Sequence, residues 1–246
     1  MNKRTTLLLI LAGAFLISAA LLFLYPVHQT HTAQQNEQEK IQSFSAYLEK
    51  QKMPQAPHES GNASEPLIAF EGLLEACRNY NERIFTEGQC NLDAQTMKTS
   101  TLNLAAYGYK QEVFAVLSCP TIDIEVPVYL GASAANLDKG VAVLGQTSLP
   151  IGGKNTSCVI AGHRSWNAAI RFRAIEDLQL GDCIYLTNPW ETLTYRVTSS
   201  KNIVPNNLNE IKIQQGKDLL ILFTCTIPNS SRYLVICQRT EERNLK

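Results

Sequence analysis

The first feature of the chain is an apolar segment over residues 7–25, which only Gly13 and Ser18 interrupt. A helix of this length crosses a hydrocarbon layer of about 30 Å. A cleavable signal peptide is the alternative, with a shorter apolar core followed by a small-residue cleavage site. Here Ala20 is followed by a further apolar stretch, which favours an uncleaved anchor.

Basic residues flank this segment on its N-terminal side. Lys3 and Arg4 precede it, and the next Lys or Arg is Lys40. The positive-inside rule therefore predicts a cytoplasmic tail over residues 1–6, a single-pass anchor in the cell membrane, and an extracellular remainder.

Helical spacing returns after the anchor in two blocks. Ile41, Phe44 and Leu48 recur at helical intervals in a polar background. Prolines and a glycine then break the helix, so residues 26–66 are predicted to be a stalk and linker. A second periodic block follows, and residues 67–111 are predicted to hold an N-terminal helix and a lid-like region.

From residue 112 onward the pattern consists of short segments rich in Val, Ile, Leu, Tyr and Thr, as is typical of β-strands. Short helices are expected at residues 133–137 and 166–178. The predicted strands are Val113–Ser118, Ile122–Tyr129, Val141–Leu144, Ser157–Ala161, Cys183–Leu186, Thr192–Val204, Asp218–Thr224 and Arg232–Gln238. Eight strands with few helices predict a mostly β fold, an eight-stranded closed β-barrel over residues 112–240, with a C-terminal tail over residues 241–246.

Composition excludes some classes of partner. The chain has 22 Lys and Arg against 22 Asp and Glu, which gives no reason to expect nucleic acid. The seven cysteines have no Cys-x-x-Cys spacing, and no His/Cys cluster suits zinc, so neither a metal nor a cofactor is predicted. A disulfide between Cys77 and Cys90, the nearest pair outside the barrel region, is left open.

One cysteine differs from the other six in its surroundings. A cysteine in an apolar run is usually a small buried hydrophobe, but the run before Cys225 ends there and a polar, turn-like segment follows. His163 also follows a predicted apolar strand, and Arg232 begins the next predicted strand. A thiol nucleophile, a proton carrier and a cation that stabilises an oxyanion are the groups that acyl transfer needs.

Other residues near these three are weaker candidates. Arg164 adjoins the histidine and is expected to point to the opposite face of an extended chain, while Arg171 and Arg173 lie on a predicted helix and are more simply solvated. Trp166 and Thr224 are candidate substrate-binding residues, since one follows the histidine and the other precedes the cysteine.

Four segments together resemble sortases, the membrane-anchored cysteine transpeptidases of mostly Gram-positive bacteria. Leu222–Arg239 resembles their Thr-Cys-Thr and Arg-Leu-Val signature, and Ala161–Arg164 resembles their histidine motif. Thr147–Gly153 is similar to the Thr-Ser-Leu-Pro-x-Gly-Gly segment of class C, the pilus-assembling sortases, and Leu178–Asp182 resembles a turn after their histidine helix. The segments follow one another in the family's order, and the resemblance covers about residues 67–240.

The resemblance implies a sortase-type barrel and a defined chemistry. Cys225 would attack an LPXTG-like sorting signal on a surface or pilin protein and form a thioester. His163 would move protons, and Arg232 would hold the carbonyl oxygen or the substrate backbone. The acceptor would be a pilin lysine, which gives pilus assembly, or a lipid-linked cell-wall precursor.

The chain also departs from the class C pattern. Residues 86–109 lack the Asp-Pro-aromatic tripeptide with which many class C lids plug the site, and residues 241–246 do not resemble a second membrane helix. A wall-anchoring sortase is therefore an alternative, as are a membrane-anchored cysteine hydrolase on the same barrel and a non-catalytic surface module in which Cys225 is simply buried.

Overall fold

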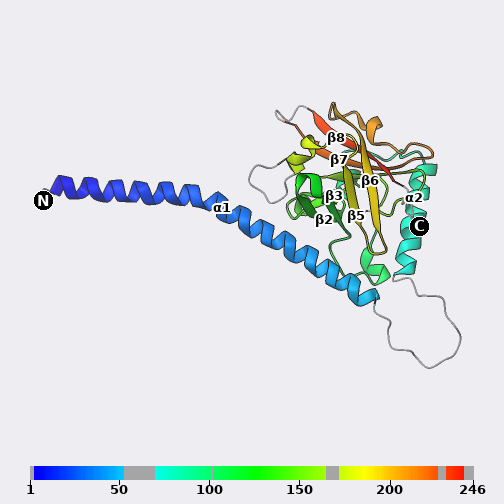
Figure 1. Ribbon diagram of the computed structural model, residues 1–246, viewed down its shortest axis with the longest axis horizontal. Helices are drawn as coiled ribbons and strands as arrows, with labels where there is room; N and C mark the ends of the chain where they lie inside the picture. The colour runs from blue at the N-terminus through cyan, green and yellow to red at the C-terminus, as the bar shows by residue number, and fades with distance from the viewer. Residues whose placement is uncertain (1–2, 53–69, 101, 165–171, 227–230, 241–246) are drawn as a thin grey trace, which may run out of the picture.

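Two long helices precede the barrel. The computed structural model describes residues 3–52, 70–100, 102–164, 172–226 and 231–240. Helix α1 spans Lys3–Lys52 and helix α2 spans Glu71–Thr86. The first half of α1 projects from the body of the molecule and its second half runs along that body (Figure 1). Across the described ranges, no helix has both the length and the apolar character needed to cross a membrane.

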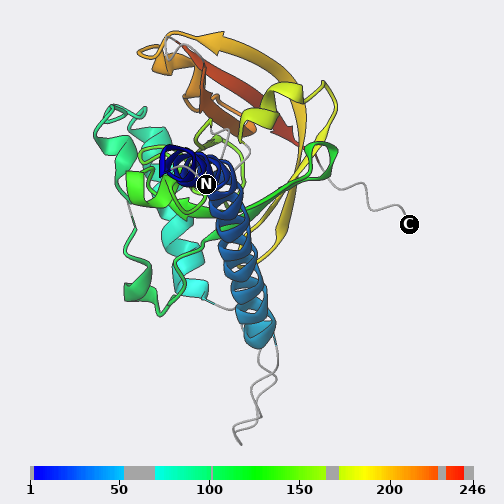
Figure 2. The same cartoon turned by 90° about the vertical axis from the view of Figure 1, so that its left-hand side faces the viewer.

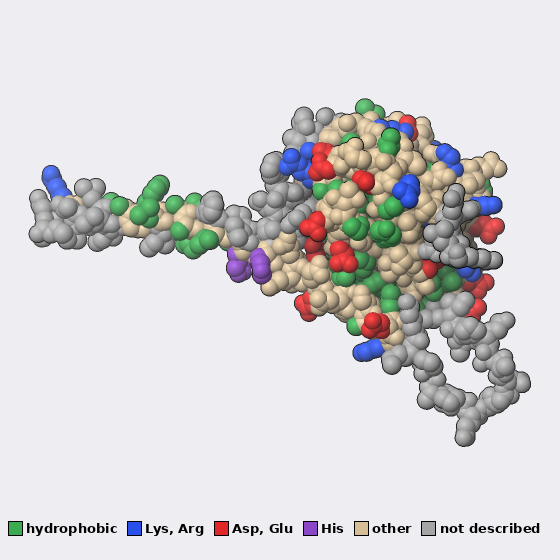
Figure 3. Space-filling model, in the orientation of Figure 1, with side chains coloured by type: hydrophobic (Ala, Val, Ile, Leu, Met, Phe, Trp, Pro, Cys, Tyr) green, Lys and Arg blue, Asp and Glu red, His purple; other side chains and the backbone are tan. Residues whose placement is uncertain are grey.

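Large apolar side chains are exposed on the projecting half of α1. More than half of the surface of each is accessible, and green side chains line this part of the helix in Figure 3. The residues are Leu11, Phe15, Leu16, Leu21, Leu22, Leu24 and Tyr25. Covering apolar surface is favourable by about 25 cal/mol per Å², so this half of the helix gains free energy from contact with an apolar medium or partner.

Within the described part of the chain, eight strands form one closed barrel. They are β1 (Ala115–Cys119), β2 (Ile124–Leu130), β3 (Val141–Val143), β4 (Thr156–Ala161), β5 (Cys183–Thr187), β6 (Thr192–Ile203), β7 (Asp218–Cys225) and β8 (Arg232–Arg239). The strand order is β1-β2-β3-β4-β7-β8-β6-β5, with β2–β3 and β4–β7 parallel and the other neighbours antiparallel. The predicted eight-stranded closed barrel is confirmed, and each strand overlaps its predicted segment.

Short helices precede the first strand and lie between later ones. They are η1 (Thr96–Lys98), η2 (Leu104–Tyr107), η3 (Pro120–Ile122), α3 (Ala134–Leu137), η4 (Phe172–Asp177) and η5 (Leu208–Ile211). Helix α3 confirms the helix expected at residues 133–137, and the Ser133 hydroxyl caps its N-terminus by accepting from the Asn136 N–H at 3.2 Å. The helix expected at residues 166–178 is described from residue 172, as the 3₁₀ turns of η4.

The core fills the barrel. Strand β6 buries Leu193, Tyr195 and Val197 and exposes Arg196 between them, because successive side chains of a strand point to opposite faces. Strand β4 is instead buried at every position, and its parallel neighbour β7 is buried at most positions. The two strands that lead to His163 and Cys225 are thus held on both faces, which gives their ends a rigid support.

The second half of α1 packs against the barrel at β2, as two views of the ribbon agree (Figures 1 and 2). Ile41, Phe44 and Leu48 form one buried face of the helix. Tyr47 stacks on Phe70 with ring centroids 5.8 Å apart, and both rings meet Tyr109 edge to face. Part of the stalk predicted over residues 26–66 therefore belongs to the body of the protein, because its apolar stripe is buried there.

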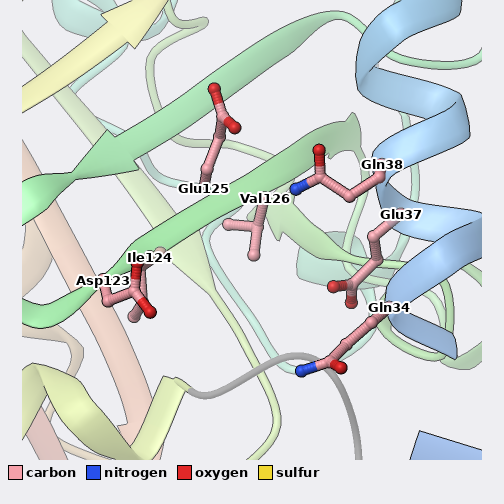
Figure 4. A pocket seen from close by; sticks show the side chains of 7 residues that line it. All are labelled: Gln34, Glu37, Gln38, Asp123, Ile124, Glu125 and Val126. Carbon is pink, nitrogen blue, oxygen red and sulfur yellow. The ribbon is translucent and has the colours of Figure 1, made fainter. Parts of the chain in front are cut away.

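A polar hollow of about 330 Å³ lies between α1 and the first half of β2. Figure 4 shows its two sides, with Gln34, Glu37 and Gln38 on the helix facing the segment Asp123–Val126. Glu37 is 8% exposed. The helix thus contacts the barrel through an apolar stripe and, further toward the N-terminus, through polar side chains.

The lid-like region predicted over residues 67–111 is clamped in part to the barrel. The Met97 carbonyl accepts hydrogen bonds from the backbone N–H groups of Ala132 (3.1 Å) and Gly145 (2.9 Å). A Cβ on Gly131 or Gly145 would come within 2.5 Å of the backbone of residues 99–100. The barrel residues that make these contacts come directly after the C-terminal ends of β2 and β3. Because β3 is antiparallel to β4, they lie at the end of these strands away from His163.

Candidate active site

Strands β7 and β8 bring the predicted nucleophile and the predicted cation together. The two strands are antiparallel, and Cys225 at the end of β7 is the register partner of Arg232 at the start of β8. Both residues are partly buried. A guanidinium N–H of Arg232 donates to the Ser231 carbonyl at 3.0 Å. The Thr226 N–H donates to the same carbonyl at 3.2 Å, so the residues that follow β7 and precede β8 are hydrogen-bonded to each other.

His163 comes to the same end of the barrel along β4. Strand β4 runs parallel to β7 with Ala161 beside Phe223, and the Gly162 N–H donates to the Phe223 carbonyl at 3.1 Å. His163 follows two residues after the end of β4, so the chain carries it toward the end of β7 at which Cys225 lies. The His163 side chain is 51% exposed. Three adjacent strand ends thus carry the thiol, the imidazole and the guanidinium.

The short link before the histidine is fixed from both sides. Thr224 is 1% exposed, and its hydroxyl donates to the Gly162 carbonyl at 2.9 Å. A Cβ on Gly162 would lie 2.5 Å from the buried ring of Phe172. A glycine is therefore required at this position. Thr224 was predicted to contact substrate, and in the structure its hydroxyl holds the link that leads to His163.

The competing cations are only partly within the described chain. Arg164 forms an ion pair with Glu176 of η4, and its side chain is 14% exposed. This pairing gives Arg164 a structural partner on η4. Arg171 and Trp166, the second predicted substrate-binding residue, lie outside the described residues.

Burial separates Cys225 from most of the other cysteines. Desolvation raises the pKa of the Cys77 thiol to about 12, and it also raises the pKa of Cys158 and Cys237. These thiols are therefore unreactive at neutral pH. Cys77 is fully buried on α2 whereas Cys90 is exposed, and both are free thiols, so the disulfide left open from the sequence is not formed.

An acidic residue that the sequence did not single out lies at the histidine. Oδ1 of Asp138 is 3.8 Å from Nε2 of His163. Asp138 directly follows the short helix α3, and nothing in its local sequence marks it, because the contact depends on how the β2–α3–β3 connection returns to the end of the barrel at which His163 lies. Among the described residues, no three metal-ligating side chains gather into a cluster.

A closed eight-stranded barrel with a cysteine, a histidine and an arginine on adjacent strand ends defines the sortase-type barrel proteins. The sequence also matches the Sortase domain over residues 117–240, about half of the chain. The chain therefore belongs to the sortase family.

Individual relatives agree with this assignment. Sortase A of Bacillus anthracis is 31% identical over 128 residues, which are 51% of this chain and 59% of that protein. The chain spans 52–59% of the length of the first curated relatives it matches.

Solved structures of class C sortases cover more of the chain. Sortase C1 of GBS pilus island 1 has a TM-score of 0.68 at 26% identity, over 85% of this chain and 96% of that chain. Sortase C of Clostridium perfringens, solved with the C-terminal cell wall sorting motif, has a TM-score of 0.63 at 30% identity, over 82% and 99%. The resemblance to class C sortases is thus confirmed.

Proposed function

We propose that this protein is a cysteine transpeptidase that cleaves an LPXTG-like sorting signal and transfers the acyl group to an amine. The observation that carries this proposal is the register pairing of Cys225 with Arg232, next to the strand end that leads to His163. Membership of a family of cysteine transpeptidases supports it. The sorting signal is supported by the Clostridium perfringens sortase C solved with its C-terminal cell wall sorting motif.

The first half of the reaction forms a thioester. Cations beside a cysteine favour the thiolate, which is the nucleophilic form. The Cys225 thiolate attacks the carbonyl carbon of the scissile peptide bond, and the N–H groups of Arg232 stabilise the oxyanion that develops on the carbonyl oxygen. His163 gives a proton to the departing amine as the C–N bond breaks.

The second half transfers the acyl group. The acceptor amine attacks the thioester carbonyl and gives its proton to His163, and Cys225 leaves as a thiolate. A new amide bond forms and the enzyme returns to its starting state. The exposed position of His163 suits this exchange of amines, since one must leave and another must enter on the same side.

The test uses a peptide that carries an LPXTG signal, with and without an added amine. We expect a thioester adduct on Cys225 by mass spectrometry and an amide product that appears when the amine is present. Cys225→Ala should abolish both and leave the barrel folded. Cleavage that is unaffected by the amine would favour the cysteine hydrolase, and wild-type cleavage by Cys225→Ala would refute the assignment.

Pilus assembly is the role that we propose for this chemistry. The class C neighbours support it, among them the sortase of GBS pilus island 1. A pilin-derived peptide with an acceptor lysine should then be a better acyl acceptor than an amine that mimics a cell-wall precursor. The opposite preference would favour the wall-anchoring alternative.

We also propose that residues 7–25 anchor the protein in the cell membrane, with the N-terminus in the cytoplasm and the barrel outside. The apolar sequence of this segment and the basic residues Lys3 and Arg4 support the proposal. So does the exposed apolar surface on the projecting half of α1. A reporter fused after Lys246 should be accessible outside the cell, and a cytoplasmic reporter would contradict the orientation.

A further inference from the structure

The contact between Asp138 and His163 lies outside the three groups to which the proposed reaction assigns a chemical step. Asp138 Oδ1 is 3.8 Å from the Nε2 atom of His163, and this contact is an ion pair when the imidazole is protonated. The two side chains are 75% and 51% exposed, so substrate has access to both. The aspartate comes from α3 and the histidine from the end of β4, so the contact joins two separate parts of the site.

The backbone that carries Asp138 is held firmly. The Asp138 N–H donates to the Ala134 carbonyl at 2.9 Å. The Asn136 amide donates to the carbonyls of Leu130 and Gly131 at 3.1 and 2.8 Å, which fixes α3 to the end of β2. Asp138 is therefore presented from a fixed turn rather than from a mobile loop.

The residues after Asp138 are fixed as well. Lys139 pairs with Glu112 at 3.2 Å, and Glu112 also pairs with Lys40 of α1 at 3.5 Å. A Cβ on Gly140 would lie 2.5 Å from the Pro127 carbonyl, so the backbone there is packed directly against β2. The backbone after Asp138 is thus held against the barrel, and the Lys139 side chain reaches α1 through the exposed carboxylate of Glu112.

We propose that Asp138 is a positioning residue for His163, which orients the imidazole and stabilises its protonated form for proton transfer to the departing amine. The inference rests on the proposed transpeptidase function. Two unit charges about 4 Å apart attract even in water, by an amount worth about fivefold in an equilibrium. Exposed pairs reach part of that, so the expected effect on turnover is about two- to fivefold.

Other charged and titratable groups also surround the imidazole. Cys225 at the end of β7 and Arg232 at the start of β8 are paired at the strand ends beside the one that leads to His163. The neighbouring Arg164 is paired with Glu176 from η4. The Cys225 thiolate favours the imidazolium and the Arg232 guanidinium opposes it. The thiolate charge is lost when Cys225 is acylated, whereas the charge on Asp138 remains. Asp138 therefore acts on the imidazolium while the departing amine is protonated and the thioester forms.

The test compares Asp138→Asn, Asp138→Glu and Glu82→Gln in the full chain. Glu82 is an exposed carboxylate on α2 and serves as a control for the loss of one negative charge. We expect Asp138→Asn to lower kcat about two- to fivefold with KM unchanged, and its turnover should begin to fall at a lower pH on the alkaline side. Asp138→Glu should restore turnover to within about twofold of the wild type, and Glu82→Gln should match the wild type.

A second readout does not need the reaction. At a fixed pH near neutrality, the NMR signal of the His163 imidazole should move in Asp138→Asn and stay in place in Glu82→Gln. If the wild type shows no transpeptidation but the signal moves, the proposed function fails while the positioning contact stands. An unmoved signal, or an Asp138→Asn enzyme with wild-type kcat and pH profile, would overturn the inference.

Discussion

Phe44 offers a direct test of whether the second half of α1 is part of the folded body. Its side chain is 1% exposed, and Ile41 and Leu48 beside it on the same helical face are 6% and 7% exposed. These side chains pack against a barrel that begins more than sixty residues later in the sequence. Phe44→Ala removes a large ring from this contact and leaves the helical backbone favourable, because alanine has the highest helix propensity.

The expected cost follows from this burial. Replacing a buried phenylalanine by alanine destabilises a protein by about 3–5 kcal/mol, since transfer free energy is lost and a cavity remains. For a protein of this size, 1 kcal/mol corresponds to about 2–4 °C in Tm. The midpoint of unfolding should therefore fall by about 6–20 °C.

The assay is thermal unfolding of the full chain in detergent, followed by tryptophan fluorescence. Trp190 is a suitable probe because its partly buried ring packs against the core. The centroid of this ring is 6.1 Å from that of Phe114, which is a core residue. Ser43→Ala is the matched control, since Ser43 is exposed on the same turn of α1. Equal midpoints for the two variants would refute the reasoning and would mean that the helix is a separate spacer.

Three further predictions concern the site. Arg232→Lys should lower turnover about tenfold or more and leave the rate at which a small reagent alkylates Cys225 nearly unchanged. The control is Arg239→Lys, which loses a guanidinium 3.6 Å from Glu191 and should lower Tm without lowering turnover. Equal activity losses would contradict the role of Arg232. Gly162→Ala should lower both Tm and kcat, because its Cβ would lie 2.5 Å from the Phe172 ring. A variant with the Tm and kcat of the wild type would contradict this close packing. In a thiol-labelling experiment at neutral pH, resolved by mass spectrometry, Cys225 should react before the buried thiols, and earlier labelling of the latter would contradict the burial. The buried thiols are Cys77, Cys119, Cys158 and Cys237.

Much of the barrel could be predicted from local patterns. A strand that buries one face must alternate apolar and polar residues, so the burial of Leu193, Tyr195 and Val197 in β6 is visible in the sequence itself. The residues of the candidate site were found for a similar reason. His163, Cys225 and Arg232 stand where apolar runs end or begin, and a strand end is a position that the chain specifies locally.

The packing of α1 could not be predicted in this way. Ile41, Phe44 and Leu48 have the spacing of any amphipathic helix, and the same stripe suits a stalk, a dimer interface or a barrel contact. The structure selects the last of these because β2 offers an apolar surface to the helix. The cysteines behave similarly, since the spacing of Cys77 and Cys90 leaves a disulfide open, and only the structure shows that both thiols are free, with Cys77 buried and Cys90 exposed.

The sequence by itself determined the type of each strand, the order of the motifs and the three groups that can carry acyl transfer, because these depend on neighbours along the chain. The seven-residue spacing already predicted that Arg232 returns beside Cys225, and the β7–β8 register confirms it. The tertiary structure alone decided that His163 joins them, because β4 runs parallel to β7. Asp138 reaches His163 from the connection between β2 and β3. The contacts of His163 with the β7 end and with Asp138 join residues far apart in sequence, and their geometry depends on strand order and register, which no local pattern encodes.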